Sequence, residues 1–219
     1  MGYNVAIDGP AGAGKSTIAK LLAKEKGYIY VDTGALYRGL AIHFLDRSIN
    51  AQDIGAVIEA VKEADVKIKY EDGAQQVYLN GRNITKRLRG EEVGRMASAT
   101  AKIPEVRDKL LMLQRNLAAE QDVVMDGRDI GTCVLPDAEV KIFLTASVKT
   151  RARRRYEELT GKGESCDLET IEEDIKKRDE QDMTRKTAPL KKAEDAYLVD
   201  SSDMTVEEVV RTIAALCKS

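Results

Sequence analysis

The residues with the clearest chemical purpose form a glycine-rich stretch near the N-terminus. Gly9 to Ser16 reads Gly-Pro-Ala-Gly-Ala-Gly-Lys-Ser, which fits the pattern Gly-x-x-x-x-Gly-Lys-Ser/Thr, and Thr17 follows. Glycines here let backbone N–H groups turn inward around phosphate oxygens, and a helix N-terminus adds a favourable dipole. Lys15 supplies a mobile positive charge, and the Ser16 hydroxyl is a candidate Mg²⁺ ligand. The stretch predicts that a triphosphate is held by Gly9, Pro10, Ala11, Gly12, Ala13, Gly14, Lys15, Ser16 and Thr17.

The sequence favours transfer of a phosphoryl group over a GTPase switch. It lacks the Asn-Lys-x-Asp stretch with which such switches read guanine. Transfer between two anionic substrates needs little covalent chemistry but much positive charge around the transferred group. Arginine suits this role because its planar guanidinium binds phosphate oxygens bidentately and stays charged. The positions of the arginines are therefore the next indication of function.

Two arginines lie just beyond predicted strands. Tyr37 and Arg38 are one turn into the helix after the second strand, and Arg128 and Asp129 directly follow a later strand. Ligands of open α/β sheets bind at the carboxyl ends of the strands. These four residues are therefore candidates for binding the second substrate.

Three more arginines share a predicted helix face. Arg151, Arg154 and Arg155 have i, i+3 and i+4 spacing. The polar, glycine-bearing loop 160–165 follows them. It reads either as a flexible surface loop or as a lid whose closure brings these arginines over the phosphates and excludes water.

The helix after that loop carries a stripe that changes from apolar to charged. Its members are, in order, Ile171, Ile175, Arg178, Asp182 and Arg185. A solvated helix face with an i, i+4 ion pair is one interpretation. Continuity with the apolar residues favours the other, in which the charges point inward and a bound sugar and phosphate satisfy them.

Carboxylates end or follow the strands close to the glycine-rich stretch. Asp8, Asp32 and Asp126 are candidates to hold a metal through water, and helix caps or turns are equally good explanations. The single histidine, His43, lies on an apolar helix and reads as structural.

The elements that position these residues predict an α/β fold with a parallel sheet. A β-favouring run over residues 3–8, a helix over 15–26 and a second strand over 28–31 open the chain with the order strand, helix, strand. A long amphipathic helix begins at Pro104. Short apolar runs typical of buried parallel strands recur at 123–125, 140–144 and 197–199.

A small antiparallel insertion interrupts this pattern. Apolar and polar residues alternate from Val66 to Leu79, and Asn80-Gly81 is a strong hairpin signal. Residues 64–90 therefore predict a β-meander, unlike the units on either side.

Composition bounds the class of protein. With 219 residues and 43% hydrophobic residues, the chain can form one core with an insertion. Its net charge of -2 argues against a binder of nucleic acid polymers. The three cysteines lie far apart, which fits a reducing cytoplasm, and no apolar run is long enough to cross a membrane.

At this point the motifs resemble those of bacterial cytidylate kinases, a family of nucleoside monophosphate kinases, over essentially the whole chain. The motifs that carry the resemblance are Ile7 to Thr17, Asp32-Thr-Gly-Ala-Leu-Tyr-Arg38, Asp126-Gly-Arg-Asp-Ile-Gly131, Arg178-Asp179 through Arg185, and Ala188-Pro189-Leu190. The first motif is common to many kinases, and the others together are specific. Some relatives carry Ser in place of Thr33 and Gly in place of Ser16.

The resemblance implies a P-loop fold with a core, a short lid and an insert that binds the nucleoside monophosphate. It implies that residues 9–17 hold ATP, with Mg²⁺, and that CMP or dCMP accepts the γ-phosphoryl group. The acceptor residues that it implies are Tyr37, Arg38 and Arg128 around the phosphate, Ser98, Arg107, Asp129 and Arg185 for cytosine, and Arg178 and Asp182 for the pentose; Thr33 is a further substrate-binding candidate. Ser98 and Arg107 rest on the resemblance alone. Lys15, Arg128, Arg151 and Arg155 are the expected catalytic residues.

The expected organisation is a single kinase domain. Its core is expected at about 1–60, 91–150 and 186–219, the insert at about 61–90 and the lid at about 151–168. The protein is expected to be a cytoplasmic monomer. The alternatives are another small-molecule kinase, such as one acting on shikimate or a different nucleotide, and a nucleotide-binding switch that transfers no phosphate.

Overall fold

The computed structural model describes residues 2–71 and 73–218 and separates the chain into two compact units. One unit contains the residues up to Tyr30 together with those from Gln121 onward, and the other is Val31–Glu120. The glycine-rich stretch belongs to the first unit, and the predicted insertion belongs to the second.

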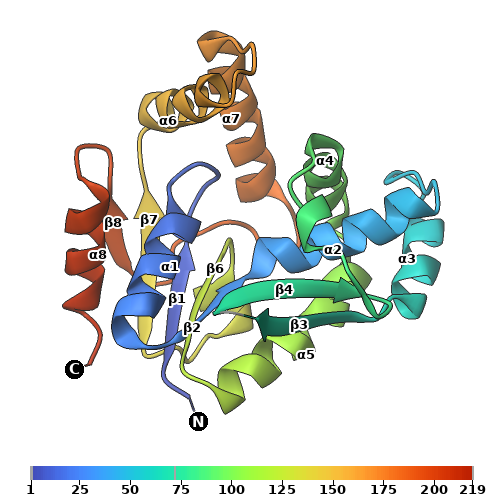
Figure 1. Ribbon diagram of the computed structural model, residues 1–219, viewed down its shortest axis with the longest axis horizontal. Helices are drawn as coiled ribbons and strands as arrows, with labels where there is room; N and C mark the ends of the chain where they lie inside the picture. The colour runs from blue at the N-terminus through green and yellow to red at the C-terminus, as the bar shows by residue number, and fades with distance from the viewer. Residues whose placement is uncertain (1, 72, 219) are drawn as a thin grey trace. The chain divides into compact units, whose positions relative to one another are not determined.

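The first unit is built on a five-stranded sheet (Figure 1). β1 pairs in parallel with β6 and with β7, and β7 pairs in parallel with β8. The strand order is β2-β6-β1-β7-β8, with bounds Ile29–Asp32, Val123–Gly127, Asn4–Asp8, Val140–Thr145 and Tyr197–Asp200. The central strands are buried on both faces, which explains why the sequence showed continuous apolar runs rather than alternation.

Four helices and one short turn belong to this unit. They are α1 (Lys15–Lys26), the π-helical turn η2 (Ile130–Val134), α6 (Val148–Gly161), α7 (Leu168–Thr184) and α8 (Val206–Ala214). Apolar residues of α1 and α8 form one core cluster with those of the sheet, and α6 packs along α7. The predicted capping box is present, since the Thr205 hydroxyl accepts from the Glu208 amide while the Glu208 carboxylate accepts from the Thr205 amide.

The second unit combines helices with the antiparallel meander. Its helices are α2 (Thr33–Asp46), α3 (Ile54–Glu63), the 3₁₀ turn η1 (Thr85–Arg87), α4 (Glu91–Thr100) and α5 (Pro104–Glu120). Its sheet has the order β3-β4-β5, with bounds Val66–Glu71, Ala74–Leu79 and Arg82–Asn83. Asn80 and Gly81 have φ of 48° and 79°, the left-handed pair that the Asn-Gly signal predicts for a tight hairpin. Leu36, Leu40 and Phe44 of α2 are fully buried in the apolar core of this unit.

The predicted fold class is confirmed by these elements. The second strand runs one residue later than predicted, because Asp32 is still extended before it caps α2. Among the described residues, no helix combines the length and apolar character needed to span a bilayer. The boundaries given for core, insert and lid stay predictions.

Candidate functional site

The glycine-rich stretch lies where β1 ends and α1 begins, and its backbone explains its glycines. Gly9 has φ of +151°, and a Cβ there would lie 1.9 Å from the Leu144 carbonyl oxygen on the neighbouring strand β7. Gly14 has φ of +85° at the N-cap of α1. Glycine is therefore required at both positions, because a side chain would clash at the first and strain the backbone at the second.

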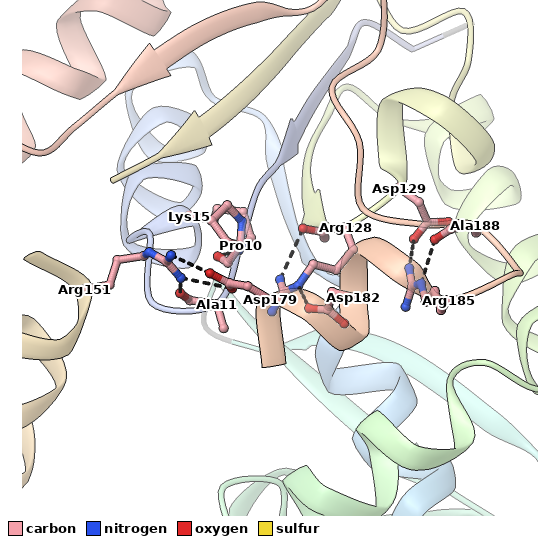
Figure 2. Close-up of polar contacts among 11 residues, drawn as sticks. Pro10, Ala11, Lys15, Arg128, Asp129, Arg151, Asp179, Asp182, Arg185 and Ala188 are labelled. Atoms are coloured by element: carbon pink, nitrogen blue, oxygen red, sulfur yellow. Dashed lines mark hydrogen bonds and ion pairs between the residues drawn. The ribbon is translucent and has the colours of Figure 1, made fainter. Parts of the chain in front are cut away.

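Lys15 is buried at the start of α1. Its ammonium donates to the Pro10 carbonyl oxygen at 2.7 Å, so it lies folded back across the loop (Figure 2). Burial first, and then the positive charge of Arg128, lower the pKa of Lys15 to about 7, although Asp126, Asp8 and Asp182 act in the opposite direction. These charges are close enough to Lys15 to shift its titration. An anionic phosphate would relieve the cost of burying this ammonium.

Ser16 and Asp126 form the polar pair closest to a metal-binding arrangement. The Ser16 hydroxyl donates to Asp126 Oδ2 at 3.0 Å, and the Tyr30 hydroxyl donates to Asp126 Oδ1 at 2.8 Å. No group of three or more His, Cys, Asp or Glu side chains in the described chain could hold a metal ion by itself. A hydroxyl with one carboxylate fits Mg²⁺, which keeps several waters and takes oxygens from substrate phosphates.

The other two candidate carboxylates have structural partners. Asp8 is buried and accepts from the amides of Ile130 and Gly131, both at 2.7 Å. Burial raises the pKa of Asp8 to about 6, although both amide hydrogen bonds act to lower it. Asp32 caps α2 by accepting from Ala35 N at 2.9 Å. Of the three, Asp126 is therefore the candidate for a metal.

Asp8 thereby fixes the turn that carries Arg128 and Asp129. Arg128 Nε donates to Asp182 Oδ2 at 2.8 Å, which links the end of β6 to α7. The Asp182 side chain is 10% exposed and that of Arg128 is 21% exposed. An ion pair this far from solvent is costly to desolvate, which favours a ligand-binding role over a surface role.

Asp129 and Arg185 are a second pair in the same unit. Arg185 Nη2 lies 3.5 Å from Asp129 Oδ1, and Arg185 Nε donates to the Ala188 carbonyl at 2.7 Å (Figure 2). Ala188 has φ of +47°, an uncommon backbone conformation for a residue with a side chain. The specific motif Ala188-Pro189-Leu190 is thus the segment that turns back to hold Arg185.

The three arginines of α6 do not form one cluster. Arg151 is buried and forms a bidentate pair with Asp179, with nitrogen–oxygen distances of 3.1 and 2.5 Å. Arg154 donates to the Ser201 carbonyl at 2.7 Å, and exposed Arg155 pairs with Glu158 at 2.8 Å. Exposure increases from Arg151 through Arg154 to Arg155, so the helix face that they share extends from the interior to solvent.

The charged stripe of α7 differs from the predicted one. Asp182 is buried and Arg185 is half-buried as expected, but Arg178 is exposed, which contradicts the inference that it points inward. The inward positions after Ile175 are Asp179 and Asp182. Asp182 accepts from Arg128, at the end of β6, rather than lying on a solvated helix face.

The second unit carries the remaining predicted residues. Asp32 pairs with Arg38 at 3.1 Å, and Arg38 Nε is buried without a hydrogen-bond partner among the described residues. The Arg107 guanidinium lies 5.9 Å from the centre of the Tyr37 ring, which connects a residue known only from the resemblance to one found from the strand pattern. Thr33 is buried at the start of α2, and Ser98 is half-buried on α4.

Sequence reasoning missed Asp179 and Tyr30 and did not foresee what Asp8 binds. Asp179 follows Arg178 directly, so a helical register placed one residue later would have put it on the inward face. Asp8 ends an apolar strand and Tyr30 lies within another, and nothing in the sequence indicates which backbone or side-chain atoms they contact.

Comparison with known proteins places the chain among kinases. The family model described as cytidylate kinase matches residues 5–219. The chain is 50% identical over 213 residues to a cytidylate kinase of Caldicellulosiruptor saccharolyticus, covering 97% of this chain and 94% of that protein. It is 47% identical over 212 residues to a cytidylate kinase of Lactobacillus gasseri, covering 97% and 92%. A crystal structure of an uncharacterized protein from Eubacterium ventriosum matches with a TM-score of 0.52 at 15% identity, covering 97% of this chain and 96% of the other; this likeness shows the fold alone.

Proposed function

Because the chain belongs to the cytidylate kinase family, we propose that it transfers the γ-phosphoryl group of ATP to CMP or dCMP, giving ADP and CDP or dCDP. The observation that carries the proposal is the set of buried charges in the first unit. Lys15, Arg128 and Asp182 affect one another electrostatically next to the glycine-rich loop. Charges buried in this way are expensive unless a ligand or a partner compensates them.

In the proposed reaction, an oxygen of the acceptor phosphate attacks the γ-phosphorus in line. The bond from the γ-phosphorus to the β,γ-bridging oxygen breaks as the new P–O bond forms, and ADP leaves. No protein base is needed, since the acceptor phosphate is already an anion. Residues 9–17 hold the donor phosphates, and Lys15 and Arg128 stabilise negative charge on the transferred group.

The acceptor residues divide by the part of the nucleotide that they contact. Arg38 and Arg128 bind the acceptor phosphate, with Thr33 and Tyr37 beside it. The partnerless Nε of Arg38 supports this assignment, because a phosphate oxygen would satisfy it. Arg178 and Asp182 hold the pentose.

Cytosine is assigned to one pair of residues in each unit. Asp129 and Arg185 together offer an acceptor and donors, the complement of the cytosine amino group and ring carbonyl. Ser98 and Arg107 are their counterparts in the second unit.

Mg²⁺ is assigned to Ser16, with Asp126 beside it. Bound there, the ion would neutralise charge on the β- and γ-phosphate oxygens. The Ser16 hydroxyl would supply an oxygen ligand, and Asp126, which accepts from Ser16 and Tyr30, would accept from a water bound to the ion.

The polar segment around loop 160–165 is assigned the role of a lid. Its closure would bring Arg155 toward the donor phosphates and exclude water, which limits hydrolysis of ATP. Arg151 contributes differently, because its guanidinium is already occupied by protein groups. The protein is expected to act as a monomer in the cytoplasm, where its three free cysteines would stay reduced.

The decisive experiment measures ADP release with a panel of acceptors: CMP, dCMP, UMP, AMP and shikimate. We expect turnover with CMP and dCMP at least tenfold above that with the others, because the base-reading residues present hydrogen-bonding groups that a different base would leave unpaired. Equal turnover with AMP, UMP and CMP would overturn the cytosine assignment. ADP release independent of any acceptor would instead support a nucleotide hydrolase or switch.

A further inference from the structure

Every nitrogen of the Arg151 guanidinium donates a hydrogen bond. The Arg151 side chain is 4% exposed. Its Nε donates to the Ala146 carbonyl at 2.9 Å. Its Nη1 donates to the Ala11 carbonyl at 2.9 Å, and both terminal nitrogens donate to the Asp179 carboxylate (Figure 2). Ala11 is part of the glycine-rich loop. One guanidinium therefore ties the start of α6, the phosphate loop and α7 together.

Packing at the loop agrees with this bonding. A Cβ built on Gly12, the residue after Ala11, would lie 3.4 Å from Arg151 Cβ, so the arginine stem lies directly against the loop backbone. Gly12 has φ of +76°, which makes its conformation dependent on neighbouring support.

Asp179 is what orients that guanidinium. A planar guanidinium with both Nη atoms on one carboxylate has its plane and direction fixed. Asp179 is 8% exposed and buried on the inward face of α7, one turn before Asp182. A buried charge pair of this kind stabilises folding little for its desolvation cost, so its value lies in what it positions.

We propose that Asp179 is a positioning residue for ATP binding: through Arg151 it holds the Ala11 peptide, and with it the phosphate loop, in the conformation that receives the triphosphate. The proposal rests on the proposed function only in taking ATP as the ligand of the loop. Arg151 is thereby a clamp on the loop. It is not a mobile lid arginine.

The test measures ATP affinity calorimetrically without acceptor, together with KM for ATP and for CMP and the melting temperature. We expect Asp179→Asn to weaken ATP binding about tenfold, because small displacements of a pre-organised site are costly, while KM for CMP changes less than threefold. Asp179→Glu, which keeps the charge, should recover part of the ATP affinity. Glu173→Gln, which removes an exposed carboxylate from the same helix, is the matched control and should leave all four quantities unchanged.

Arg151→Lys provides a second route if Asp179→Asn does not fold. Lysine keeps the charge but cannot reach both carbonyls and the carboxylate, so ATP affinity should again fall about tenfold, and the double variant should lose little more than either single one. Unchanged ATP affinity in a folded Asp179→Asn, or a parallel fall of ATP affinity, CMP affinity and melting temperature, would overturn the proposal. The proposal would also be overturned if the losses of ATP affinity in the two single variants added fully in the double variant. A wild-type protein that binds ATP but releases no ADP with CMP would refute the proposed function and leave this test intact.

Discussion

The two units bury different kinds of side chain. In the first unit, eight charged side chains of the described residues are buried: Asp8, Lys15, Asp126, Asp129, Lys141, Arg151, Asp179 and Asp182. In the described part of Val31–Glu120 the buried polar residues are Thr33, His43, Thr100 and Gln114, none of them an acidic side chain, a lysine or an arginine. His43 accords with this pattern, since burial lowers its pKa and so favours the neutral imidazole. The buried residues of the second unit are thus those of an ordinary apolar core, whereas the first unit also buries many charged side chains.

The difference separates residues kept for stability from residues kept for chemistry. Buried charges cost free energy even when paired, and apolar residues of the same volume would often stabilise a fold better. The buried charges of the first unit gather around the glycine-rich loop, β6 and α7. Removing a charge there should therefore reduce activity strongly, whereas removing a surface charge of the second unit that is not among the predicted acceptor residues should do little.

The largest effect is expected for Lys15→Met. Loss of the ammonium should lower kcat at least a thousandfold, because the proposed reaction relies on Lys15 to stabilise negative charge on the transferred phosphoryl group. The unfolded chain holds the Lys15 proton up to 10.5, but the folded one loses it at about 7, so the Lys15 contribution to stability rises with pH across that window. The variant should lose this rise and melt at a higher temperature near pH 7, in unfolding experiments at several pH values. Lys24→Met, at an exposed position of α1, should change neither property; activity within tenfold of wild type for Lys15→Met would contradict the assignment.

The next effect is expected for Arg128→Met. It should lower kcat/KM for CMP by about 10² to 10³, because charge-assisted bonds to phosphate are lost. It also leaves Asp182 buried without this partner, so the melting temperature should fall. Adding Asp182→Leu should recover the melting temperature without recovering activity. If the double variant regains activity, the pair is structural; Arg153→Met, at an exposed position of α6, is the control.

A smaller effect is expected in the second unit for Arg38→Met. KM for CMP should rise roughly tenfold to a hundredfold, while the dissociation constant of ATP stays within twofold, since the loss is confined to one phosphate contact. The half-exposed pair of Arg38 with Asp32 adds little stability, so the melting temperature should hardly change. Steady-state kinetics with both substrates varied would measure this. An equal rise of both constants would mean that Arg38 acts on the whole protein rather than on the acceptor.

Asp8, one of the buried charges of the first unit, should make both activity and stability depend on pH. Its carboxylate must be ionised to accept two amide hydrogens, and its pKa is raised to about 6, so activity should fall as pH drops below 6. Its contribution to stability runs the other way: it is fully present below 3.8 and is lost as pH rises through about 6. Asp8→Asn should lower kcat about tenfold, because the amide nitrogen cannot accept from Gly131, and should flatten the acid limb of the pH profile. A profile with the same acid limb in the variant would assign that limb to another group.

The sequence predicted elements better than partners, and particular residues show why. Alternation, apolar runs and the Asn80-Gly81 turn depend on short-range backbone preferences, so β3, β4 and the parallel strands follow from them. The Lys15 loop follows from a motif with its own chemical reason. Side-chain partners across 28 or 122 residues, such as Arg151 with Asp179 or Asp8 with Ile130, depend on how packed elements meet. Even within one helix the prediction of the buried face was off by one position: Arg178 was expected to point inward, but the buried residue is Asp179.

The smallest effect should come from the surface pair of Arg87 with Asp46 in the second unit. Both oxygens of Asp46 accept from Arg87, at 2.9 and 2.5 Å, yet the side chains are 52% and 47% exposed. Arg87 lowers the pKa of Asp46, so the contribution of the pair is present above 3.8 and is lost as pH falls through the lower folded value. Arg87→Met should change the free energy of unfolding in urea by less than about 1 kcal/mol, and by less still at high salt, with kinetics unchanged. A loss as large as that of the buried Arg128 variant would mean that exposure does not decide the value of an ion pair in this protein, and the contrast between the units would fail.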